Sequence, residues 1–270
     1  MSIISDFKSS PISLFGVNGL VNSADISLQT LVGSRFSSGD YREFVLVQNG
    51  AVALPSGVLV QGPASIGANH TGLAVVANAA IGATQITVTL GGTAVTANQY
   101  AGGFAVISAG TGIGQTLRIA SHPAQSTTSG NVVLTLEDPL SVAITSSTSK
   151  VSLTLNPYGS LNGAAVSTHG VIVSPSAGSS GPSIGVTVGP IAASTAATLA
   201  AGGIPQYGFI QTKGAVACLN DSTTAIGLDV MPSSAISGAV VTYVVATRNR
   251  VGTSTVAGES TKAQIINIQL

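Results

Sequence analysis

The chain has 270 residues, with nine Lys and Arg against nine Asp and Glu, so its formal net charge is zero. Charged residues make up 7% of the chain, whereas an ordinary soluble domain has roughly 25%. Because the net charge is zero, the chain lacks the excess of basic residues with which proteins bind DNA or RNA. Aromatic residues make up only 4% of the chain and Trp is absent, which argues against a surface on which single-stranded bases stack. An apolar content of 44% is enough for a sizeable core, so we expect a folded chain.

No segment predicts a membrane-spanning helix or a secretory signal. Polar residues or glycines interrupt the charge-free runs 44–117 and 151–212 well before about 18 apolar residues follow one another. Asp6 and Lys8 stand where a signal needs an unbroken apolar stretch. The single cysteine, Cys218, excludes an internal disulfide, and its apolar neighbours predict a buried strand position. We therefore expect synthesis in a reducing compartment and no membrane attachment.

The predicted elements begin after a Ser-rich, weakly patterned stretch at residues 1–40. This stretch is either an extended N-terminal arm that docks on a neighbouring subunit or a frayed terminus. From residue 41 onward, β-branched residues alternate with small polar ones in short runs that end in Gly, Pro or Asn, which is typical of all-β proteins. The clearest predicted strands are 43–48, 85–90, 104–108, 116–120, 132–136, 151–155, 171–174, 184–188, 207–212, 215–219, 239–246 and 264–269.

Turn-forming residues divide these strands into two β-sandwich or β-barrel domains, at residues 66–156 and 157–270, with boundaries near 63–68 and 156–159. The first strands, in residues 41–65, have two possible partners. They pair either with the domain that follows them or with the C-terminal domain, which would make the middle domain an insertion. Short helical turns are predicted at 96–101 and 194–201, each beginning with a Thr or Ser that can cap it and followed by Gly-Gly.

The residues that most often carry chemistry do not form a recognisable set. His70, His122 and His169 lie about fifty residues apart, without the short spacing that puts metal ligands on one face, so we expect no metal site. Glu137 and Asp138 are adjacent, so on a strand they would point to opposite faces, and a turn before Pro139 explains them better.

Other polar motifs have simple structural explanations. The glycine-rich run 110–116 lacks the Lys of a phosphate-binding loop and is followed by a strand pattern, which predicts a hairpin loop. Two further groups of charges predict a solvated loop, at Arg248 and Arg250, and a local ion-pair network, at Asp40, Arg42 and Glu43. The sequence thus predicts no catalytic residue, no cofactor and no enzyme.

A longer likeness begins at the segment GGTAVTANQYAGGFAVISAGTGIGQTLRIASHPA, residues 91–124. It resembles a segment of virion structural proteins of tailed bacteriophages, and the segments 136–144, 155–159 and 207–219 are similar to later parts of such proteins, in the same order. The residues that carry the likeness are Asn98, Tyr100, Gly102, Gly103, Gly114, Gln115, Arg118 and Ile119. The resemblance implies a capsid-associated decoration or cement protein, made in the host cytoplasm and located on the virion surface.

The scarcity of charge favours the same role, because a subunit embedded among other subunits presents small uncharged side chains to its neighbours. We expect the major capsid protein as partner, with no nucleic acid and no membrane. We also expect a homo-oligomer, with a trimer favoured by analogy with threefold positions in capsids. The alternative is a receptor- or glycan-binding fibre or adhesin subunit, although five Tyr and no Trp offer few platforms for sugars. An enzyme that acts on polysaccharides would need two placed carboxylates, and no such pair is evident.

Overall fold

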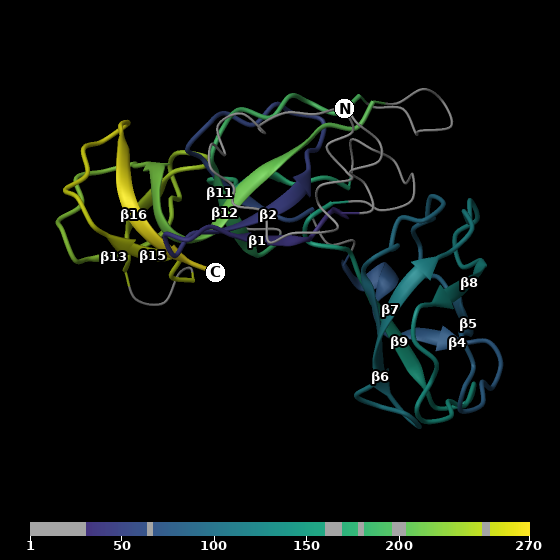
Figure 1. The fold of residues 1–270 in the computed structure, drawn as a ribbon. Helices are drawn as coiled ribbons and strands as arrows, with labels where there is room; N and C mark the ends of the chain where they lie inside the picture. The colour runs from purple at the N-terminus through teal and green to yellow at the C-terminus, as the bar shows by residue number, and fades with distance from the viewer. Residues whose placement is uncertain (1–30, 64–66, 160–168, 178–180, 196–203, 245–248) are drawn as a thin grey trace.

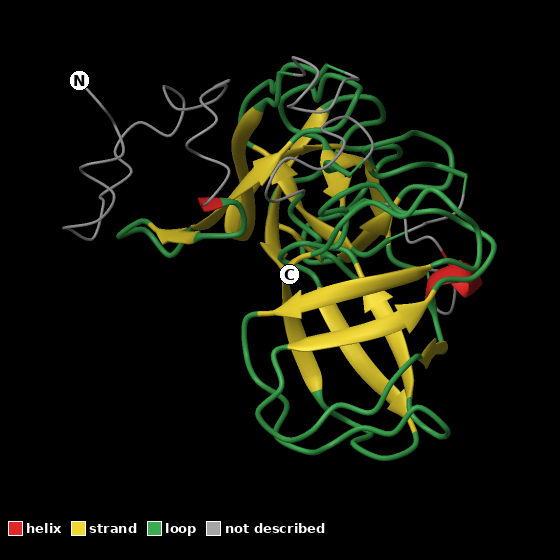
Figure 2. Cartoon of the chain, turned by 90° about the vertical axis from the view of Figure 1, so that its right-hand side faces the viewer, coloured by secondary structure: helices red, strands yellow, loops and turns green. Residues whose placement is uncertain are grey.

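The computed structural model of the chain describes residues 31–63, 67–159, 169–177, 181–195, 204–244 and 249–270, and it is almost entirely β (Figures 1 and 2). Its strands form two bodies, a ten-stranded sheet and a closed six-stranded barrel, as the all-β prediction expects. The strands are β1 (Arg35–Ser37), β2 (Glu43–Gln48), β3 (Leu59–Gln61), β4 (Leu73–Val75), β5 (Gln85–Thr89), β6 (Phe104–Ala109), β7 (Thr116–Ser121), β8 (Asn131–Leu136), β9 (Lys150–Thr154), β10 (Ile172–Val173), β11 (Ser183–Thr187), β12 (Tyr207–Leu219), β13 (Asp229–Pro232), β14 (Val240–Thr242), β15 (Gly252–Ser254) and β16 (Ala263–Gln269).

The ten-stranded sheet contains strands from before the barrel in the sequence, β1 to β3, and from after it, β10 to β16. Its main path runs β10-β3-β11-β12-β16-β15-β13-β14, and β2 adds to β12 with β1 at its outer side. The early strands β2 and β3 therefore pair with strands of the C-terminal half, and β3 also pairs with β10. Because the barrel strands β4 to β9 lie between β3 and β10 in the chain, the barrel interrupts the sequence of the sheet.

One long strand, β12, holds the two halves of this sheet together. The alternation predicts two strands, 207–212 and 215–219, but the structure joins them into one strand of 13 residues. A register shift lies between Gln211 and Lys213, and Gly214 takes a positive φ of 88°. The Gln211 side-chain amide donates to the carbonyls of Lys213 and Ala215, at 2.9 and 3.0 Å, which satisfies the backbone at this irregularity. Residues 207–212 and 215–219 thus belong to one strand, although the residues between them are typical of a turn.

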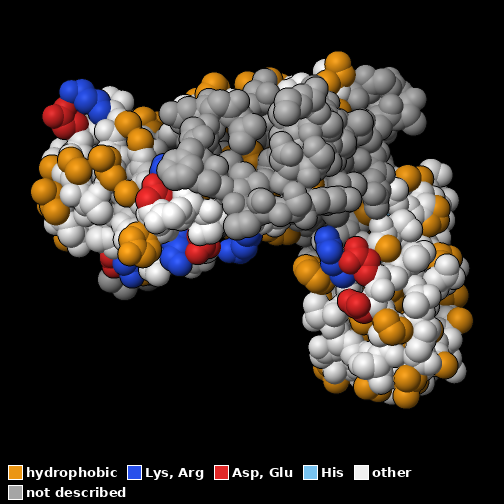
Figure 3. Space-filling model, in the orientation of Figure 1, with side chains coloured by type: hydrophobic (Ala, Val, Ile, Leu, Met, Phe, Trp, Pro, Cys, Tyr) orange, Lys and Arg blue, Asp and Glu red, His pale blue; other side chains and the backbone are white. Residues whose placement is uncertain are grey.

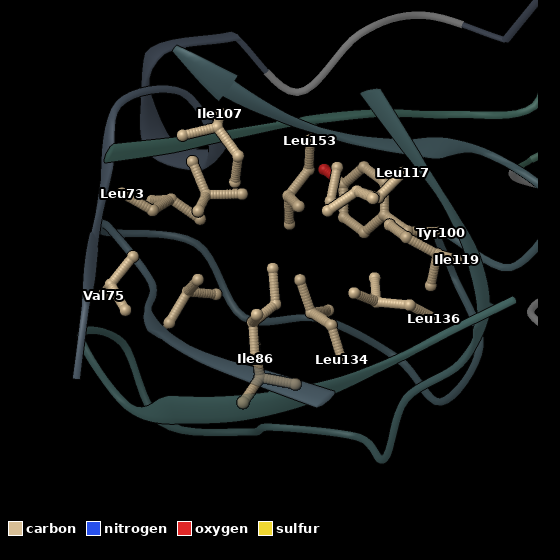
Figure 4. Close-up of a cluster of buried hydrophobic side chains, with 14 of the residues drawn as sticks. Leu73, Val75, Ile86, Tyr100, Ile107, Leu117, Ile119, Leu134, Leu136 and Leu153 are labelled. Carbon is tan, nitrogen blue, oxygen red and sulfur yellow. The ribbon is translucent and has the colours of Figure 1, made fainter. Parts of the chain in front are cut away.

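The barrel is closed in the order β4-β5-β8-β7-β6-β9, and alternate residues of each strand point inward. The inward side chains fill its interior, as Figure 4 shows for ten labelled residues. The core consists of Leu73, Val75, Ile86, Val88, Leu90, Val95, Tyr100, Ala105, Ile107, Leu117, Ile119, Val132, Leu134, Leu136, Leu140, Ile144, Val151 and Leu153. The outward positions carry mainly Thr, Ser, Gln and Asn, for example Thr87 and Thr89 of β5.

Several local expectations differ from the structure. The helical turn predicted at 96–101 is wrong: this stretch forms successive turns, because Asn98 has a positive φ of 56° and a helix cannot continue through it. The segment predicted at 194–201 lies largely outside the described residues. Short strands β1, β3, β4, β13 and β15 were not among the clearest predictions, because three or four residues are too few for an alternation pattern.

The N-terminal stretch is described only from residue 31. There the chain is part of the sheet, because β1 pairs with β2, with Phe36 opposite Phe44. The proposed arm therefore ends before the boundary expected at residue 40, and residues 1–30 lie outside the described part of the chain. Within the described residues, no helix has the length and apolar character needed to cross a bilayer.

Candidate functional site

Two of the three histidines come together at the end of the barrel that joins the sheet, although they are 52 positions apart in the chain. The Tyr100 hydroxyl lies 2.5 Å from Nδ1 of His70, and the Tyr100 backbone N–H donates to Nε2 of His122 at 3.0 Å. The second nitrogen of each ring faces a carbonyl, that of Thr93 for His70 and that of Pro123 for His122, at 2.9 Å each. A carbonyl only accepts, so each ring carries its proton on the carbonyl side and uses the other nitrogen as an acceptor.

His70, Tyr100 and His122 have the properties of a structural network and not of a reactive site. Burial lowers the pKa of His122, the Pro123 carbonyl opposes this effect, and the charges of His70 and His169 lower the pKa further. Burial also raises the pKa of Tyr100 well above its ordinary value. Both ring nitrogens of His70 and of His122 are engaged, so neither imidazole has a lone pair left for a metal ion. No group of three or more potential metal-ligating residues exists among the described residues.

A groove of about 490 Å³ lies beside this network, where the chain enters and leaves the barrel. Its polar side chains include His70 and Tyr100 from the barrel. The remaining lining is mainly apolar side chains and prolines or glycines: Gly62, Pro63, Gly67, Thr71, Phe104, Leu153, Thr154, Leu155, Pro157, Gly181 and Pro182. Among the described residues that line the groove there is no carboxylate, lysine or arginine, and its two titratable side chains, His70 and Tyr100, are hydrogen-bonded to each other.

Most of the charged residues singled out in the sequence form surface ion pairs. Glu137 directly follows β8 and pairs with Arg118 at 3.2 Å. Asp40 pairs with Arg42 at 2.6 Å, as expected, and the Ser38 hydroxyl together with Arg42 holds the pKa of Asp40 below its ordinary value. Arg250 lies in an exposed loop, as expected, and pairs there with Asp229 at 2.9 Å. Among these residues the structure brings together no pair of carboxylates.

The structure also shows where the remaining residues singled out in the sequence and the glycine-rich run lie. Glu43 bridges Lys213, at 3.0 Å, and Arg35, at 3.8 Å, across neighbouring strands. Arg248 lies outside the described residues, and Cys218 is fully buried in β12, as its apolar neighbours predicted. The glycine-rich run 110–116 forms the loop and first strand residue of the β6–β7 hairpin, as expected.

The opposite end of the barrel is formed by three loops that the sequence did not single out. All pairings in the barrel are antiparallel, so β4, β6 and β8 run away from the sheet, whereas β5, β7 and β9 run back toward it. The loops 76–84, 110–115 and 137–149 therefore meet at the free end, seen at the bottom of Figure 2. We refer to residues 76–84, 110–115 and 139–149 as the barrel tip.

Hydrogen bonds connect the loops of the barrel tip to one another. The Gln115 side chain donates to the Val142 carbonyl at 3.0 Å and accepts from the backbone N–H groups of Ser141 and Val142, at 2.9 and 3.0 Å. Asn78 accepts from the Ser146 N–H at 2.8 Å, which joins the first loop to the third. These contacts hold the three loops in one arrangement.

The barrel tip exposes large aliphatic side chains on a surface without charge. Ile81 is 69% exposed, Ile113 is 66% exposed and Val142 is 46% exposed. Residues 76–84, 110–115 and 139–149 contain no Lys, Arg, Asp or Glu, and the two acidic residues of the third loop, Glu137 and Asp138, stand at its start, directly after β8. The one local signal in the sequence is that each isoleucine directly precedes a glycine of its loop, Gly82 or Gly114, both with positive φ. An aliphatic residue in such a turn is expected to be exposed. Which other exposed residues lie beside it can be seen only in the folded structure.

Comparisons with known proteins add no relative, because no protein-family model, curated protein or solved structure matches this chain. The two ends of the barrel are the features that bear on function. One end holds a closed hydrogen-bond network of His70, Tyr100 and His122, and the other offers a preorganised apolar surface.

Proposed function

We propose that the chain is a non-enzymatic structural subunit of a bacteriophage virion. In this role it decorates or cements the capsid shell and docks on the major capsid protein through the barrel tip. The observation that carries the proposal is the exposure of Ile81, Ile113 and Val142 on the hydrogen-bonded barrel tip, whose residues 76–84, 110–115 and 139–149 bear no charge.

The physical reason is the cost of association. Ordering flexible loops on binding opposes complex formation, and loops that are already fixed avoid much of this cost. The Gln115 and Asn78 side chains supply such fixation. Protein interfaces are also poor in charged residues at their centres, so an uncharged apolar tip is more stable when it is buried against a protein surface than when it is exposed to water.

The composition of the barrel supports a location among other subunits. Residues 67–156 contain four charged residues, Arg118, Lys150, Glu137 and Asp138, two of each sign. Two of the four neutralise each other in the ion pair between Arg118 and Glu137. A barrel surface made of Thr, Ser and small apolar residues lacks the charges that keep an isolated protein soluble. We expect it to be covered in part by neighbouring subunits on the virion surface.

One observation favours the alternative of a receptor- or glycan-binding subunit. Tyr41 is 87% exposed at the tip of the β1–β2 hairpin, with a positive φ of 67°. A displayed aromatic ring can stack on a sugar. Binding to a glycan array that is lost in Tyr41→Ala would favour this role over shell docking.

The experiment on the proposed function measures docking on capsid shells. Purified chain is added to shells assembled without it, and bound copies per shell are measured by sedimentation and located by cryo-electron microscopy. Ile113→Asp is expected to reduce binding at least tenfold, because it places a charge at the centre of the apolar contact. Val52→Asp is the matched control, since Val52 is 68% exposed and belongs to the connection between β2 and β3 of the sheet, not to the barrel.

Wild-type chain that does not bind shells, or Ile113→Asp that binds as well as wild type, would contradict the proposal. Equal thermal unfolding of the two variants and the wild type shows that lost binding does not come from lost folding.

A further inference from the structure

The barrel tip has a polar side beside its aliphatic residues. Thr111 of the second loop and Thr145 and Thr148 of the third loop bring their hydroxyl groups together, and we call these three groups the hydroxyl cluster. The Oγ1 atom of Thr145 lies 2.7 Å from that of Thr148 and 3.3 Å from that of Thr111, and the last two lie 3.5 Å apart. A hydroxyl both donates and accepts, so the cluster can rotate a donor toward an oxygen atom of a partner.

Lys150 directly follows the third loop of the barrel tip, at the first position of β9. Val151 and Leu153 of this strand belong to the barrel core, so the alternation of β9 points Lys150 outward. Its partners on the two adjoining strands are Ala74 of β4 and Ala109 of β6. Alanine side chains are short and uncharged, so they leave room for the ammonium group of Lys150 to reach a partner.

The hydroxyl cluster lies next to Lys150. Thr148 stands two positions before Lys150, so their Cα atoms are at most about 7 Å apart. Between them the buried Ser149 donates its hydroxyl to the Thr111 carbonyl at 2.7 Å, which fixes the third loop against the second. One side of the barrel tip therefore carries three hydroxyls and, at its border, a cation.

The acidic residues of the barrel lie on the opposite wall. Glu137 and Asp138 directly follow β8, and in the closed order β4-β5-β8-β7-β6-β9 this strand is three strands from β9 in either direction. Glu137 pairs with Arg118 at 3.2 Å. Among the described residues, no carboxylate forms an ion pair with Lys150. In Figure 3 the free end of the barrel, at the lower right, shows hydrophobic and uncharged side chains.

We infer that the barrel tip docks on a protein surface that holds a carboxylate beside an apolar pocket. Lys150 and the hydroxyl cluster face the carboxylate, and Ile113 and Val142 enter the pocket. This inference rests on the proposed function and adds the chemistry of the partner site. An ammonium group at the border of an apolar contact loses part of its hydration on docking, and a carboxylate opposite it replaces the lost water. A partner with a basic group at this place would repel Lys150.

The charges also determine the orientation of the docked barrel. Lys150 lies on one wall, and the exposed acids Glu137 and Asp138 lie on the other. Half a turn of the barrel about its axis would bring these acids toward the carboxylate of the partner, and like charges that face each other oppose binding. Lys150 is therefore the residue that selects one orientation on the shell.

The test measures binding of charge variants to capsid shells by sedimentation. Lys150→Glu is expected to weaken binding at least about tenfold, because a carboxylate then faces a carboxylate. Lys150→Arg keeps the charge and should bind within about threefold of wild type. Lys262→Glu is the matched control: it changes the net charge of the chain by the same amount on the sheet, where Lys262 pairs with Glu259, and should bind like wild type.

Two further measurements separate the roles of charge and hydroxyl. Raising the salt concentration from about 50 mM to about 500 mM should weaken binding of wild type by about threefold and should strengthen binding of Lys150→Glu, because salt screens attraction and repulsion alike. Thr148→Val removes one hydroxyl of the cluster and should weaken binding by about two- to fivefold at either salt concentration. Equal thermal unfolding of all variants shows that the changes in binding do not come from lost folding.

Lys150→Glu that binds as well as Lys262→Glu would overturn the inference, as would Lys150→Arg that binds as weakly as Lys150→Glu. The two proposals fail in different ways. Shell binding that Ile113→Asp removes and Lys150→Glu leaves unchanged overturns the inference alone. A wild-type chain that does not bind shells overturns the proposed function and, with it, this inference.

Discussion

The hydroxyl of Tyr100 donates a hydrogen bond to Nδ1 of His70, 2.5 Å away, with 30 positions of chain between them. Through its backbone N–H, Tyr100 also donates to His122, so one residue holds both imidazoles at the barrel end that faces the sheet. The three side chains are between 1% and 4% exposed. Buried polar groups of this kind stabilise a fold only while all of them keep their partners.

Tyr100→Phe removes the hydroxyl and leaves Nδ1 of His70 without its donor. We expect a loss of about 1–3 kcal/mol in the free energy of unfolding, because a buried acceptor loses its hydrogen bond. Urea unfolding followed by circular dichroism measures this loss. Tyr41→Phe is the control, since Tyr41 is 87% exposed and its change should have little effect. Equal stability of Tyr100→Phe and wild type would contradict the assigned network.

Stability is expected to decrease on mild acidification because of His122. Burial lowers the pKa of this side chain in the folded protein, whereas the unfolded chain has the ordinary value of about 6.5. Below that pH the unfolded state therefore binds more protons than the folded state, so stability is full above about pH 6.5 and is lost as the pH falls toward the folded pKa.

The measurement compares urea unfolding of wild type and His122→Gln from pH 8 to pH 5. A glutamine oxygen can accept from the Tyr100 N–H but does not titrate, so the variant should show a smaller loss between these pH values. The same loss in both proteins would show that His122 is not responsible.

Gly103→Ala is expected to destabilise the barrel. A Cβ atom at this position would lie 2.0 Å from the Thr154 carbonyl oxygen, on the neighbouring strand β9. Relief of that overlap requires β6 and β9 to move apart, which costs roughly 2–4 kcal/mol. Thermal unfolding measures the cost. Gly39→Ala is the matched control, because its Cβ would meet nothing within 4 Å. A Gly103→Ala protein as stable as the control would argue against this close strand approach.

The Cys218 thiol is expected to be unreactive while the protein is folded. Burial raises its pKa to about 12, with a hydrogen bond to the Leu59 backbone acting in the opposite direction. At pH 8 the reactive thiolate is therefore scarce, and we expect labelling by a disulfide reagent at least about 1000-fold slower than in denaturant. Rapid labelling of the native protein would show that β12 opens locally.

Gln115→Ala is expected to loosen the barrel tip. The variant loses the hydrogen bonds to Ser141 and Val142, so amide hydrogen exchange should increase in residues 139–149. If a fixed tip is needed for docking, shell binding falls by about tenfold, since the loops must then be ordered on binding. Unchanged exchange would show that Gln115 does not hold the loops together.

Local patterns were sufficient for most of the strands. The alternation over 43–48 predicts β2 with the bounds that the structure shows, and 264–269 predicts β16 within one residue. Pro55-Ser56-Gly57 has the composition of a turn and forms one, with Gly57 at a φ of 73°. In contrast, the run 96–101 predicted a helix, because a helical composition does not reveal that Asn98 takes a positive φ. The histidine spacing, which predicted only the lack of a metal site, did not indicate that His70 and His122 share Tyr100 as a partner, since spacing contains no information on which loops meet.

The amino-acid sequence by itself determined the all-β class, the turn positions and the shortage of charge, because each of these depends on neighbouring residues or on composition alone. Only the tertiary structure decided that the barrel closes on itself, that β2 and β3 join strands of the C-terminal half, and which aliphatic side chains stay exposed. Such pairings are made between positions far apart in the chain, as in the 163 positions between Leu46 and its partner Phe209. Many alternative pairings satisfy the same alternation, and the choice among them depends on how all the strands pack together.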